Sequence, residues 1–399
     1  MKIVLASNWF NHHEKFFCDA INSKPDVEFY FIQTERIPEE RLKLGYQDVT
    51  KSTPYCICSY ESKEEYERAI GICNEADALI LGSAPYEFIA DRVRNNKLTF
   101  FYAERLFRKG LWHMLYPPTF FTVLKRFIIP GRKSNFYLLA ASGYTAWDTS
   151  RIFAFNKRRF KWGHLIDVPS TVANNPKQQL ENIGLKHQKD VSILWAGRLI
   201  GWKHPDMSIR VAKTLKERGV NFTLKIIGTG DMEKSLRQMI TENNLGDCVQ
   251  MLGAMQPTEV RQYMNEADVY LFTSDFNEGW GAVLGESMSS GCAVVTSHGI
   301  GATPFLVHHN QNGLIYETGN YNSFERNVIK LVESESLRER LGAAAQKTMS
   351  ETWNPSVGAD RFHSLCKSLI ERGTPIYYEQ GPISKAEILH NNWFKDDTI

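Results

Sequence analysis

The stretch Ser274–Met288, SDFNEGWGAVLGESM, decides the fold of the chain around it. The apolar run Val269–Phe272 before it predicts a buried parallel strand. The residues after the loop predict a helix that stops near Gly291, and Ala293–Thr296 predicts the next buried strand. Strand, polar loop, helix and strand form a βαβ unit, and ligands bind such units at the carboxyl ends of the strands.

The loop has the chemistry of an anion site beside hydroxyl-binding carboxylates. Gly279 and Gly281 allow the backbone to approach a ligand, and the start of the helix attracts a group such as a diphosphate. Glu278 is better placed to accept hydrogen bonds from ligand hydroxyls, and Glu286 lies up to about 12 Å further along the helix. A nucleotide sugar fits this arrangement. The alternative is structural: Glu278 caps the helix electrostatically and Glu286 is a solvated helix residue.

A second loop carries two cations. Val191–Ala196 predicts a strand, the loop GRLIGWKHPD (residues 197–206) follows it, and a helix is predicted to run to about Arg218. Arg198 and Lys203 therefore lie on one loop at the carboxyl end of a strand. Arginine offers a planar fork to phosphate oxygens, and lysine offers a point charge.

Together these stretches resemble the retaining glycosyltransferases of family 4, of the bacterial polysaccharide-biosynthesis type. The family's Gly-Arg pair, with a lysine five residues after the arginine, is similar to Gly197, Arg198 and Lys203, and its Glu-x7-Glu motif is similar to Glu278 and Glu286. The resemblance implies the α/β fold called GT-B. In that fold two Rossmann-like, doubly wound domains face a central cleft, and a C-terminal helix crosses back to the N-terminal domain.

The resemblance also implies roles for individual residues. Arg198 and Lys203 would hold the donor diphosphate and Glu278 would contact the transferred sugar, so these three are predicted to be catalytic. Glu286 would contact the ribose, and the loops at Gly228 and Gly253 would approach the nucleoside. The predicted donor-binding residues are Gly197, Arg198, Lys203, Gly228, Gly253, Glu278, Gly279, Trp280, Gly281 and Glu286. One family feature is missing, because the run His298–Phe305 lacks the glutamate of the family's Gly-Gly-x-x-Glu segment.

The expected reaction is transfer of a hexosyl group with retention at the anomeric carbon. The two cations and the helix start would stabilise charge on the leaving diphosphate, and that phosphate would deprotonate the acceptor, so no side-chain base is assigned. The histidine pairs His12-His13 and His308-His309 lack the i, i+4 spacing of a helical metal site. We therefore expect no metal and no cofactor beyond the nucleoside-diphosphate sugar itself, with a UDP-sugar as the favoured donor.

Alternating strands and helices in the N-terminal half predict another doubly wound parallel sheet. The strands expected there are Lys2–Ala6, Val27–Ile32, Ala78–Leu81, Leu98–Tyr102 and Tyr137–Ala141, and the helices are Glu14–Ile21, Lys63–Cys73, Tyr86–Arg94 and Thr145–Phe153. In the C-terminal half the expected strands are Val191–Ala196, Phe222–Ile227, Val249–Leu252, Val269–Phe272, Ala293–Thr296 and Leu314–Tyr316, and a helix is expected from Asn354 to about Arg372.

The length of 399 residues suits two domains better than one. We expect an acceptor-binding domain at 1–172 and a donor-binding domain at 190–354. Residues 355–399 would form the crossover helix and a tail that packs on the first domain. The boundary is expected in the polar, turn-rich segment Thr171–Lys189.

Four residues in the N-terminal half are candidates for the acceptor side of a cleft. Asn8, His12 and His13 follow the first strand on a loop without glycine, so the backbone is not expected to cradle phosphate there. The alternative for this loop is N-capping by Asn11 with exposed histidines. Glu104 follows another strand and either contacts an acceptor or forms a surface ion pair.

Charge is concentrated between Arg105 and Lys161, where twelve Lys or Arg residues stand against one acid, Asp148, in a chain of net charge +2. Aromatic residues are interleaved with these cations, which favours a surface that lies on anionic lipid. Nucleic acid is the lower-ranked alternative because no nucleic-acid-binding motif accompanies the segment, and a basic rim for a phosphorylated substrate is the other.

Seven scattered cysteines, no signal peptide and no apolar run of about 20 residues favour the cytoplasm, with peripheral attachment to the inner face of the membrane. The basic segment makes a lipid-linked saccharide of the cell envelope the expected acceptor. Two other functions stay open: a nucleotide-sugar epimerase of the same fold, which needs no acceptor, and a non-catalytic nucleotide-sugar-binding module.

Overall fold

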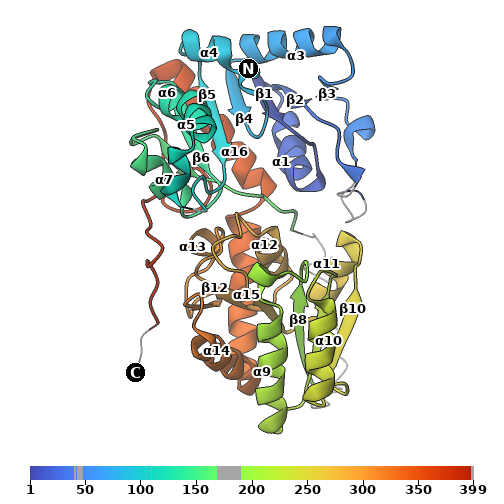
Figure 1. Ribbon diagram of the computed structural model, residues 1–399. Coiled ribbons are helices and arrows are strands. Elements are labelled where there is room, and N and C mark those ends of the chain that lie inside the picture. The colour runs from blue at the N-terminus through green and yellow to red at the C-terminus, as the bar shows by residue number, and fades with distance from the viewer. Residues whose placement is uncertain (40–41, 43–47, 109, 169–189, 397–399) are drawn as a thin grey trace. The chain divides into compact units, whose positions relative to one another are not determined.

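The computed structural model describes the chain except for residues 40–41, 43–47, 109, 169–189 and 397–399 (Figure 1). The chain divides into two compact units. Unit 1 consists of Met1–Ile166 and Thr352–His390, and unit 2 consists of Asp167–Glu351 and Asn391–Ile399. The expected boundary segment Thr171–Lys189 lies outside the described residues.

Unit 1 is built on a sheet that has seven parallel strands among the described residues, in the order β3-β2-β1-β4-β5-β6-β7. The strands are β1 (Lys2–Ser7), β2 (Glu28–Gln33), β3 (Cys56–Cys58), β4 (Ala78–Leu81), β5 (Thr99–Ala103), β6 (Phe136–Ala140) and β7 (Arg159–Lys161). The helices are α1 (His12–Asn22), α3 (Lys63–Glu75), α4 (Ala90–Arg94), α5 (Pro117–Val123), α6 (Ile129–Gly131), α7 (Thr145–Arg151) and α16 (Pro355–Arg372). Short turns of other helix types are η1 (Thr50–Ser52), η2 (Tyr86–Phe88), η3 (Leu111–Leu115) and the π-helical η4 (Leu124–Ile128).

Helices cover both faces of this sheet. The apolar residues of α3, α4 and α7 join alternate residues of the strands, such as Leu79 and Leu138, in one core. On the other face α16 packs against α1 and the strands, and the ring centroid of Phe362 lies 4.9 Å from that of Phe100 and 6.0 Å from that of Phe17. Helix α16, close to the end of the chain, therefore completes the core of unit 1.

Unit 2 has a sheet with six parallel strands among the described residues, in the order β10-β9-β8-β11-β12-β13. The strands are β8 (Val191–Ala196), β9 (Phe222–Ile227), β10 (Val249–Gly253), β11 (Val269–Phe272), β12 (Ala293–Ser297) and β13 (Leu314–Tyr316). The helices are α9 (Asp206–Glu217), α10 (Glu233–Glu242), α11 (Pro257–Glu266), α12 (Ala282–Ser289), α13 (Thr303–Leu306), α14 (Tyr321–Glu333) and α15 (Glu335–Glu351), with a 3₁₀ turn η6 (Gly201–Lys203).

The core of unit 2 also has two sides. Helices α9, α10 and α14 bury their apolar residues against strand residues such as Val269 and Leu271. Tyr270 and Phe272 point to the opposite face because side chains alternate along a strand, and α11 and α12 contact the sheet from that face. Both units thus show the doubly wound order of a Rossmann fold, in which the strand order reverses once. The predicted fold class, an α/β fold with two such sheets, is confirmed.

The structure departs from the sequence prediction in several places. The strands β3 and β7 were not predicted, because each is only three residues long and carries no clear alternation. Helix α1 begins at His12, two residues early, because Asn11 is its N-cap. The helix expected over Tyr86–Arg94 is divided into η2 and α4. Residues 355–399 were predicted to pack wholly on the first domain, but residues from Asn391 onward belong to unit 2.

Candidate functional site

The candidate site lies at the carboxyl edge of the unit 2 sheet, where the strand order reverses between β8 and β11. These two strands are paired side by side, with Ile193 opposite Val269. The loops that follow them are 197–205 and 273–281. In open α/β sheets this switch point is where ligands bind, because the two loops diverge and leave a crevice between them.

Hydrogen bonds tie these two loops together. The indole Nε1 of Trp195 donates to Oγ1 of Thr273 at 2.8 Å, and that hydroxyl donates to the backbone oxygen of Lys203 at 2.6 Å. The backbone N–H of Asp275 donates to the carbonyl oxygen of Trp202 at 3.0 Å. The sequence motifs of the two loops, 75 residues apart, therefore form one connected structure.

Lys203 and Glu278 form the central ion pair of the site. The Nζ of Lys203 lies 2.6 Å from Oε2 of Glu278, and their side chains are only 12% and 13% exposed. The hydroxyl of Ser274 donates to the same carboxylate oxygen at 3.0 Å. Two aromatic rings also face the ammonium group, with centroids 4.8 Å away for Trp202 and 5.8 Å away for Phe272. An arriving anion would compete with Glu278 for the lysine.

A second, more exposed pair joins the same loops. His204 Nε2 lies 3.5 Å from Oδ2 of Asp275. The hydrogen bond with this carboxylate raises the pKa of His204 above its usual range, against the opposing effect of burial. The Asp275 carboxylate therefore stabilises the charged form of this histidine.

Arg198 is exposed on the first loop, and its guanidinium carbon lies 5.9 Å from the ring centroid of Trp202. The backbone around it is fixed, because Leu199 donates its N–H to the carbonyl oxygen of Thr229 at 2.9 Å. An exposed guanidinium on a fixed loop is suited to bind an anion from solution.

Three of the predicted glycines lie next to one another at the ends of β8, β9 and β10. Gly197 donates its N–H to Ile227, and Gly228 donates its N–H to the carbonyl oxygen of Gly253 at 2.7 Å. A Cβ on Gly228 would lie 1.8 Å from the carbonyl oxygen of Gly197, and its φ of +134° also disfavours a side chain. At these three glycines the strand ends therefore present backbone without a side chain.

The start of α12 has no side-chain cap. Gly281 occupies the N-cap position with φ +88° and provides no side-chain cap, so the first N–H groups of the helix are directed toward the crevice end of the sheet. A Cβ there would lie 2.7 Å from ring atoms of Phe272 and 3.2 Å from Cγ of Glu278. Gly279 and Trp280 are buried, and the indole of Trp280 is 1% exposed and packs near Phe305. The side chain of Trp280 is thus a core element, and only its backbone belongs to the loop.

Glu286 is half-buried rather than solvated. Burial raises its pKa, and the nearby charge of Arg261 opposes that rise. Arg261 donates to the backbone oxygen of Glu286 and, at 2.8 Å, to Oγ of Ser289. The interpretation of Glu286 as a solvated helix residue is therefore wrong for this structure.

The candidates of unit 1 lie at the corresponding edge of the other sheet. Asn8 accepts a hydrogen bond from Ser7 at 3.3 Å, and Asn11 caps α1 through the N–H of His13 at 2.9 Å. The alternative of N-capping by Asn11 is therefore confirmed, although His12 and His13 are half-buried rather than exposed. Glu104 forms an ion pair with Arg108, which is the surface pair foreseen as its alternative.

Three residues that the sequence analysis did not single out accompany these histidines. His164 lies with its ring centroid 5.4 Å from that of His13, and its Nδ1 lies 3.4 Å from the hydroxyl of Tyr102. Glu14 completes the capping box of α1 by accepting from the N–H of Asn11 at 3.3 Å. Tyr102 ends a predicted strand and Glu14 follows His13, so position alone could have signalled them. His164 follows the unpredicted strand β7.

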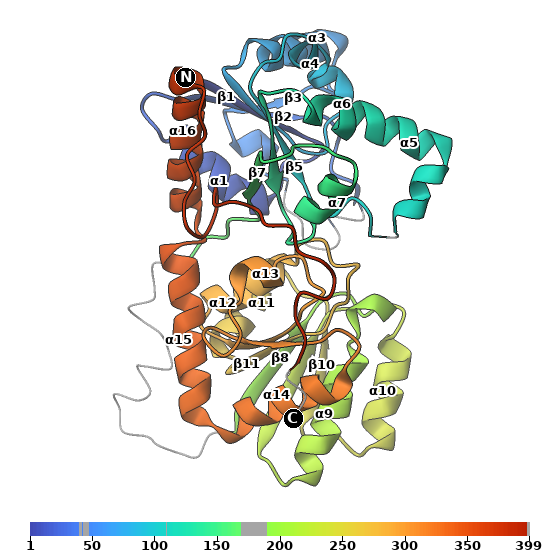
Figure 2. The ribbon, with the colours of Figure 1, turned by 90° about the vertical axis from the view of Figure 1, so that its left-hand side faces the viewer.

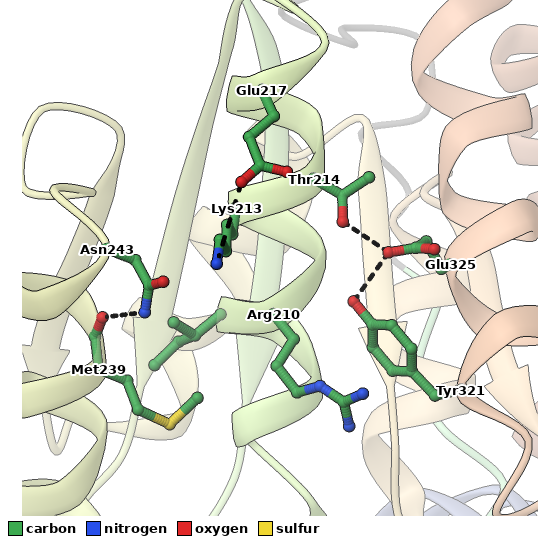
Figure 3. A pocket seen from close by; sticks show the side chains of 9 residues that line it. Arg210, Lys213, Thr214, Glu217, Met239, Asn243, Tyr321 and Glu325 are labelled. Atoms are coloured by element: carbon green, nitrogen blue, oxygen red, sulfur yellow. Dashed lines mark hydrogen bonds and ion pairs between the residues drawn. The ribbon is translucent and has the colours of Figure 1, made fainter.

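A separate hollow of about 380 Å³ lies between α9, α10 and α14 (Figure 3). Its charged side chains already have partners, since Lys213 pairs with Glu217 and the carboxylate of Glu325 accepts from Thr214 and Tyr321. No residue of the strand-end loops lines it. Among the described residues, no group of three or more His, Cys, Asp or Glu side chains is placed to hold a metal ion.

Similarity to solved structures defines the class of fold. A structure of the Anabaena protein Alr3699/HepE in complex with UDP superposes with a TM-score of 0.66 at 16% identity, covering 92% of this chain and 100% of that one. The lipopolysaccharide outer core galactosyltransferase WaaB gives a TM-score of 0.65 at 15% identity, with 91% and 98% covered. The fold is GT-B.

Sequence similarity to known glycosyltransferases lies mainly in the second half of the chain. Residues 176–348 match the family model described as Glycosyl transferases group 1. The amylovoran biosynthesis glycosyltransferase AmsK of Erwinia amylovora is 30% identical over 241 residues, or 56% of this chain and 59% of that protein. A Campylobacter jejuni N-acetylgalactosaminyltransferase, whose name specifies a diphospho-undecaprenol-linked substrate, is 33% identical over 191 residues, 44% of this chain and 50% of that protein. The aligned parts thus span about half the length of these relatives.

Proposed function

We propose that this protein is a retaining glycosyltransferase that moves a sugar from a UDP-sugar to a lipid-linked saccharide during synthesis of a cell-envelope polysaccharide. The observation that carries the proposal is the Lys203–Glu278 pair at the switch point, on loops that belong to the group 1 glycosyl transferase match. AmsK and the Campylobacter enzyme support the polysaccharide context and the lipid-linked acceptor, and the UDP complex of HepE supports the nucleotide.

In this proposal the site works by electrostatic stabilisation. Arg198 and Lys203 bind the diphosphate and, with the uncapped start of α12, stabilise the charge that develops as the glycosidic bond lengthens. Lys203 exchanges part of its contact with Glu278 for phosphate oxygens. The freed carboxylate of Glu278 then accepts hydrogen bonds from the sugar hydroxyls, and Glu286 accepts from the ribose. The reaction needs no metal because the protein provides the positive charge.

The first test uses a panel of nucleotide sugars in a thermal-shift assay, since a bound donor raises the melting temperature by mass action. Arg198→Ala and Lys203→Ala should then lower the turnover of the stabilising donor by about 10²–10³ while the protein stays folded. Lys213→Ala, in the helix layer, is the control and should leave turnover unchanged. Full turnover in both site variants would remove these residues from the role.

Three further measurements address the remaining parts of the proposal. NMR of the first-formed product should show the anomeric configuration of the donor retained. Excess EDTA should leave the rate unchanged, and a loss restored by a divalent cation would contradict metal independence. Isomerised donor formed without any acceptor would favour the epimerase alternative.

We also propose that unit 1 contacts anionic lipid through the segment 111–132. Its exposed large apolar side chains are Trp112, Leu115, Tyr116, Phe120, Phe121 and Ile129. Exposed cations, including Lys125 and Arg132, accompany them. The contact proposed is peripheral, on the cytoplasmic face. No helix among the described residues combines the length and apolar character that a membrane span needs.

Not all of the cations counted between Arg105 and Lys161 are free to bind lipid. Arg105 is buried beside Asp148, with Nε 3.7 Å from Oδ2, and its guanidinium stacks on Tyr144. Arg126, Arg158 and Arg159 donate to backbone carbonyl oxygens. These four arginines stabilise the fold, so the lipid surface depends more on the aromatic residues than the sequence indicated.

Vesicle flotation tests the lipid contact. The protein should float with phosphatidylglycerol vesicles and stay unbound with phosphatidylcholine vesicles, because the exposed cations need anionic headgroups. The double variant Trp112→Ser, Phe121→Ser should reduce binding about tenfold or more, since two exposed aromatic side chains are lost. Phe153→Ser removes an exposed ring outside the segment and is the control. Equal flotation of all three proteins would contradict the proposal.

A further inference from the structure

The residues Asn391–Asp396, here called the tail, lie against unit 2 although the chain before them belongs to unit 1 (Figure 2). The backbone oxygen of Asn391 lies 2.8 Å from Nε2 of His298, and the indole Nε1 of Trp393 donates to the carbonyl oxygen of His298 at 3.4 Å. Asp396 pairs with Arg326 of α14 at 3.1 Å. The tail thus has specific polar contacts on unit 2, centred on His298.

His298 is held from its other side as well. The backbone N–H of Thr318 donates to Nδ1 of His298 at 2.8 Å, so Nδ1 is the acceptor nitrogen. Nε2 must then carry the proton, because its partner is the carbonyl oxygen of Asn391. His298 is 3% exposed, its ring is neutral, and two backbone groups fix both the tautomer and the orientation of the ring.

The ring of His298 in turn contacts the loop that carries Glu278. Its centroid lies 5.2 Å from that of Phe276, with the two planes at 87°. The next residue, Gly299, lies so close that a Cβ would be 3.2 Å from the backbone nitrogen of Phe276. A continuous set of contacts therefore runs from Trp393 through His298 to Phe276, two residues before the carboxylate of the central ion pair.

We infer that the tail is a positioning element of the nucleotide-sugar site: it fixes His298, and His298 fixes Phe276 and the loop of Glu278. The inference rests on the proposed function, because it assigns the loop at 273–281 to donor binding. Neither His298 nor Trp393 is a catalytic residue in this view. Each acts through the loop that it orders.

A tail that only stabilises the fold would give a different result from a tail that positions the loop. In the first case the melting temperature changes while nucleotide affinity does not. In the second case nucleotide affinity falls in protein that remains folded, and the loss is shared by every change that breaks the same set of contacts. Affinity measured well below the melting temperature separates the two.

The experiment measures UDP binding by calorimetry in the unaltered protein and three variants. Trp393→Ala removes the indole contact, and His298→Asn keeps an acceptor near Nδ1 for Thr318 but cannot reach Asn391. The matched control is Tyr377→Ala, because Tyr377 is an aromatic residue of the preceding segment that packs on Phe160 in unit 1. Both test variants should bind UDP about tenfold more weakly, and the control should bind as the unaltered protein does.

Hydrogen exchange in the absence of nucleotide gives an independent measurement. Both test variants should exchange faster at 273–281 and 297–301, with unchanged protection in β8 and β9. Unchanged UDP affinity together with unchanged exchange at these loops would overturn the inference. Failure of the unaltered protein to bind UDP or any nucleotide sugar would instead overturn the proposed function, and hydrogen exchange alone would then decide whether the tail orders the loop.

Discussion

The two units share a strand order but differ in the chemistry at the point where that order reverses. In unit 2 the loops after β8 and β11 carry Arg198, the Lys203–Glu278 pair and an uncapped helix start, and glycines lie at the ends of β8, β9 and β10. In unit 1 the loop after β1 contains no glycine, and Asn11 and Glu14 cap its helix. The helix start at the unit 2 edge has no side-chain cap, whereas the helix start at the unit 1 edge is capped by a side chain.

The titrating groups of unit 1 reinforce this contrast. Burial raises the pKa of Glu14 to about 8 and lowers the pKa of His164 to about 4. Burial and the neighbouring histidines also lower the pKa of His13. All three groups therefore favour their uncharged forms near neutral pH, whereas the pKa of His204 in unit 2 is shifted in the direction that stabilises the charged form. The fold fixes where the loops are, and the residue types decide whether an edge suits charged or neutral ligand groups.

The largest expected effect tests the glycine edge of unit 2. Gly228→Ala would place a Cβ 1.8 Å from the carbonyl oxygen of Gly197, so the strand ends of β8 and β9 must separate. We expect a loss of about 3 kcal/mol or more in the free energy of unfolding, measured by chemical denaturation. Gly246→Ala, where no heavy atom lies within 4 Å of the added Cβ, is the control and should change little. Near-equal stability of both variants would mean that the edge is not tightly packed.

The central ion pair should be coupled more strongly than a surface pair. Lys203→Met leaves the Glu278 carboxylate in a largely buried position without its cation, which should destabilise the protein by about 1–3 kcal/mol. Adding Glu278→Gln should recover part of that loss, so a double-mutant cycle should give a coupling of about 1 kcal/mol or more. The exposed pair Lys213–Glu217 serves for comparison and should give about 0.3–0.5 kcal/mol. Equal coupling energies in the two cycles would contradict the expectation that the Lys203–Glu278 pair is coupled more strongly than an exposed pair.

Glu14 should make stability depend on pH in a predictable direction. Its pKa is about 8 in the folded chain against an ordinary value of 4.5, so the folded state holds the extra proton between these values. The contribution of Glu14 to the free energy of unfolding is therefore fully present below about pH 4.5, and it is lost as the pH rises to about 8. Tyr102 and Cys18 face Glu14, and its charge contributes to the raised pKa of each, so neither offsets the effect.

Glu14→Gln keeps an acceptor for the capping box and removes the titration. At pH 9 the variant should be more stable than the unaltered protein by about 1–2 kcal/mol, and at pH 5 the two should be nearly equal. Thermal unfolding across this range is the measurement. Glu61→Gln changes an exposed carboxylate in the same unit and should show no such trend. A constant difference between Glu14→Gln and the unaltered protein at all pH values would refute the assignment.

The smallest effect is spectroscopic. In an NMR titration the ring of His164 should stay neutral down to about pH 4, and the ring of His204 should titrate above 6.5. His164→Gln and His204→Gln assign the two signals. If both rings titrated near 6.5, the electrostatic difference between the two edges would be lost.

The sequence predicted the secondary structure of unit 2 more completely than that of unit 1. Strands β8, β9, β11 and β13 begin and end where they were predicted, and β11 and β13 are buried along their whole length. In unit 1 the three-residue strands β3 and β7 have no pattern long enough to recognise. Without β7, nothing indicated that His164 would lie beside His13.

The candidate site was foreseeable in its members but not in its contacts. The resemblance to family 4 assigned Lys203 and Glu278 to one site, yet their direct ion pair depends on the register of β8 against β11, which no local pattern contains. The tail was beyond prediction for a similar reason, since Trp393 and Asn391 find their partner 93 to 95 residues away. Burial of Trp280 also went unrecognised, because a tryptophan in a glycine-rich loop resembles a ligand contact.

The path of the chain through the two units has a practical consequence. Neither unit is an uninterrupted piece of sequence, since unit 1 needs Thr352–His390 and unit 2 takes up the residues after it. A fragment that stops at Ile166 would leave Phe17 and Phe100 without Phe362, and an apolar sheet face would be open to water. Cutting the gene after the codon for Ile166 should therefore yield an insoluble N-terminal fragment, and rescue should require that α16 be supplied again, for example by fusing residues 352–390 behind a flexible linker.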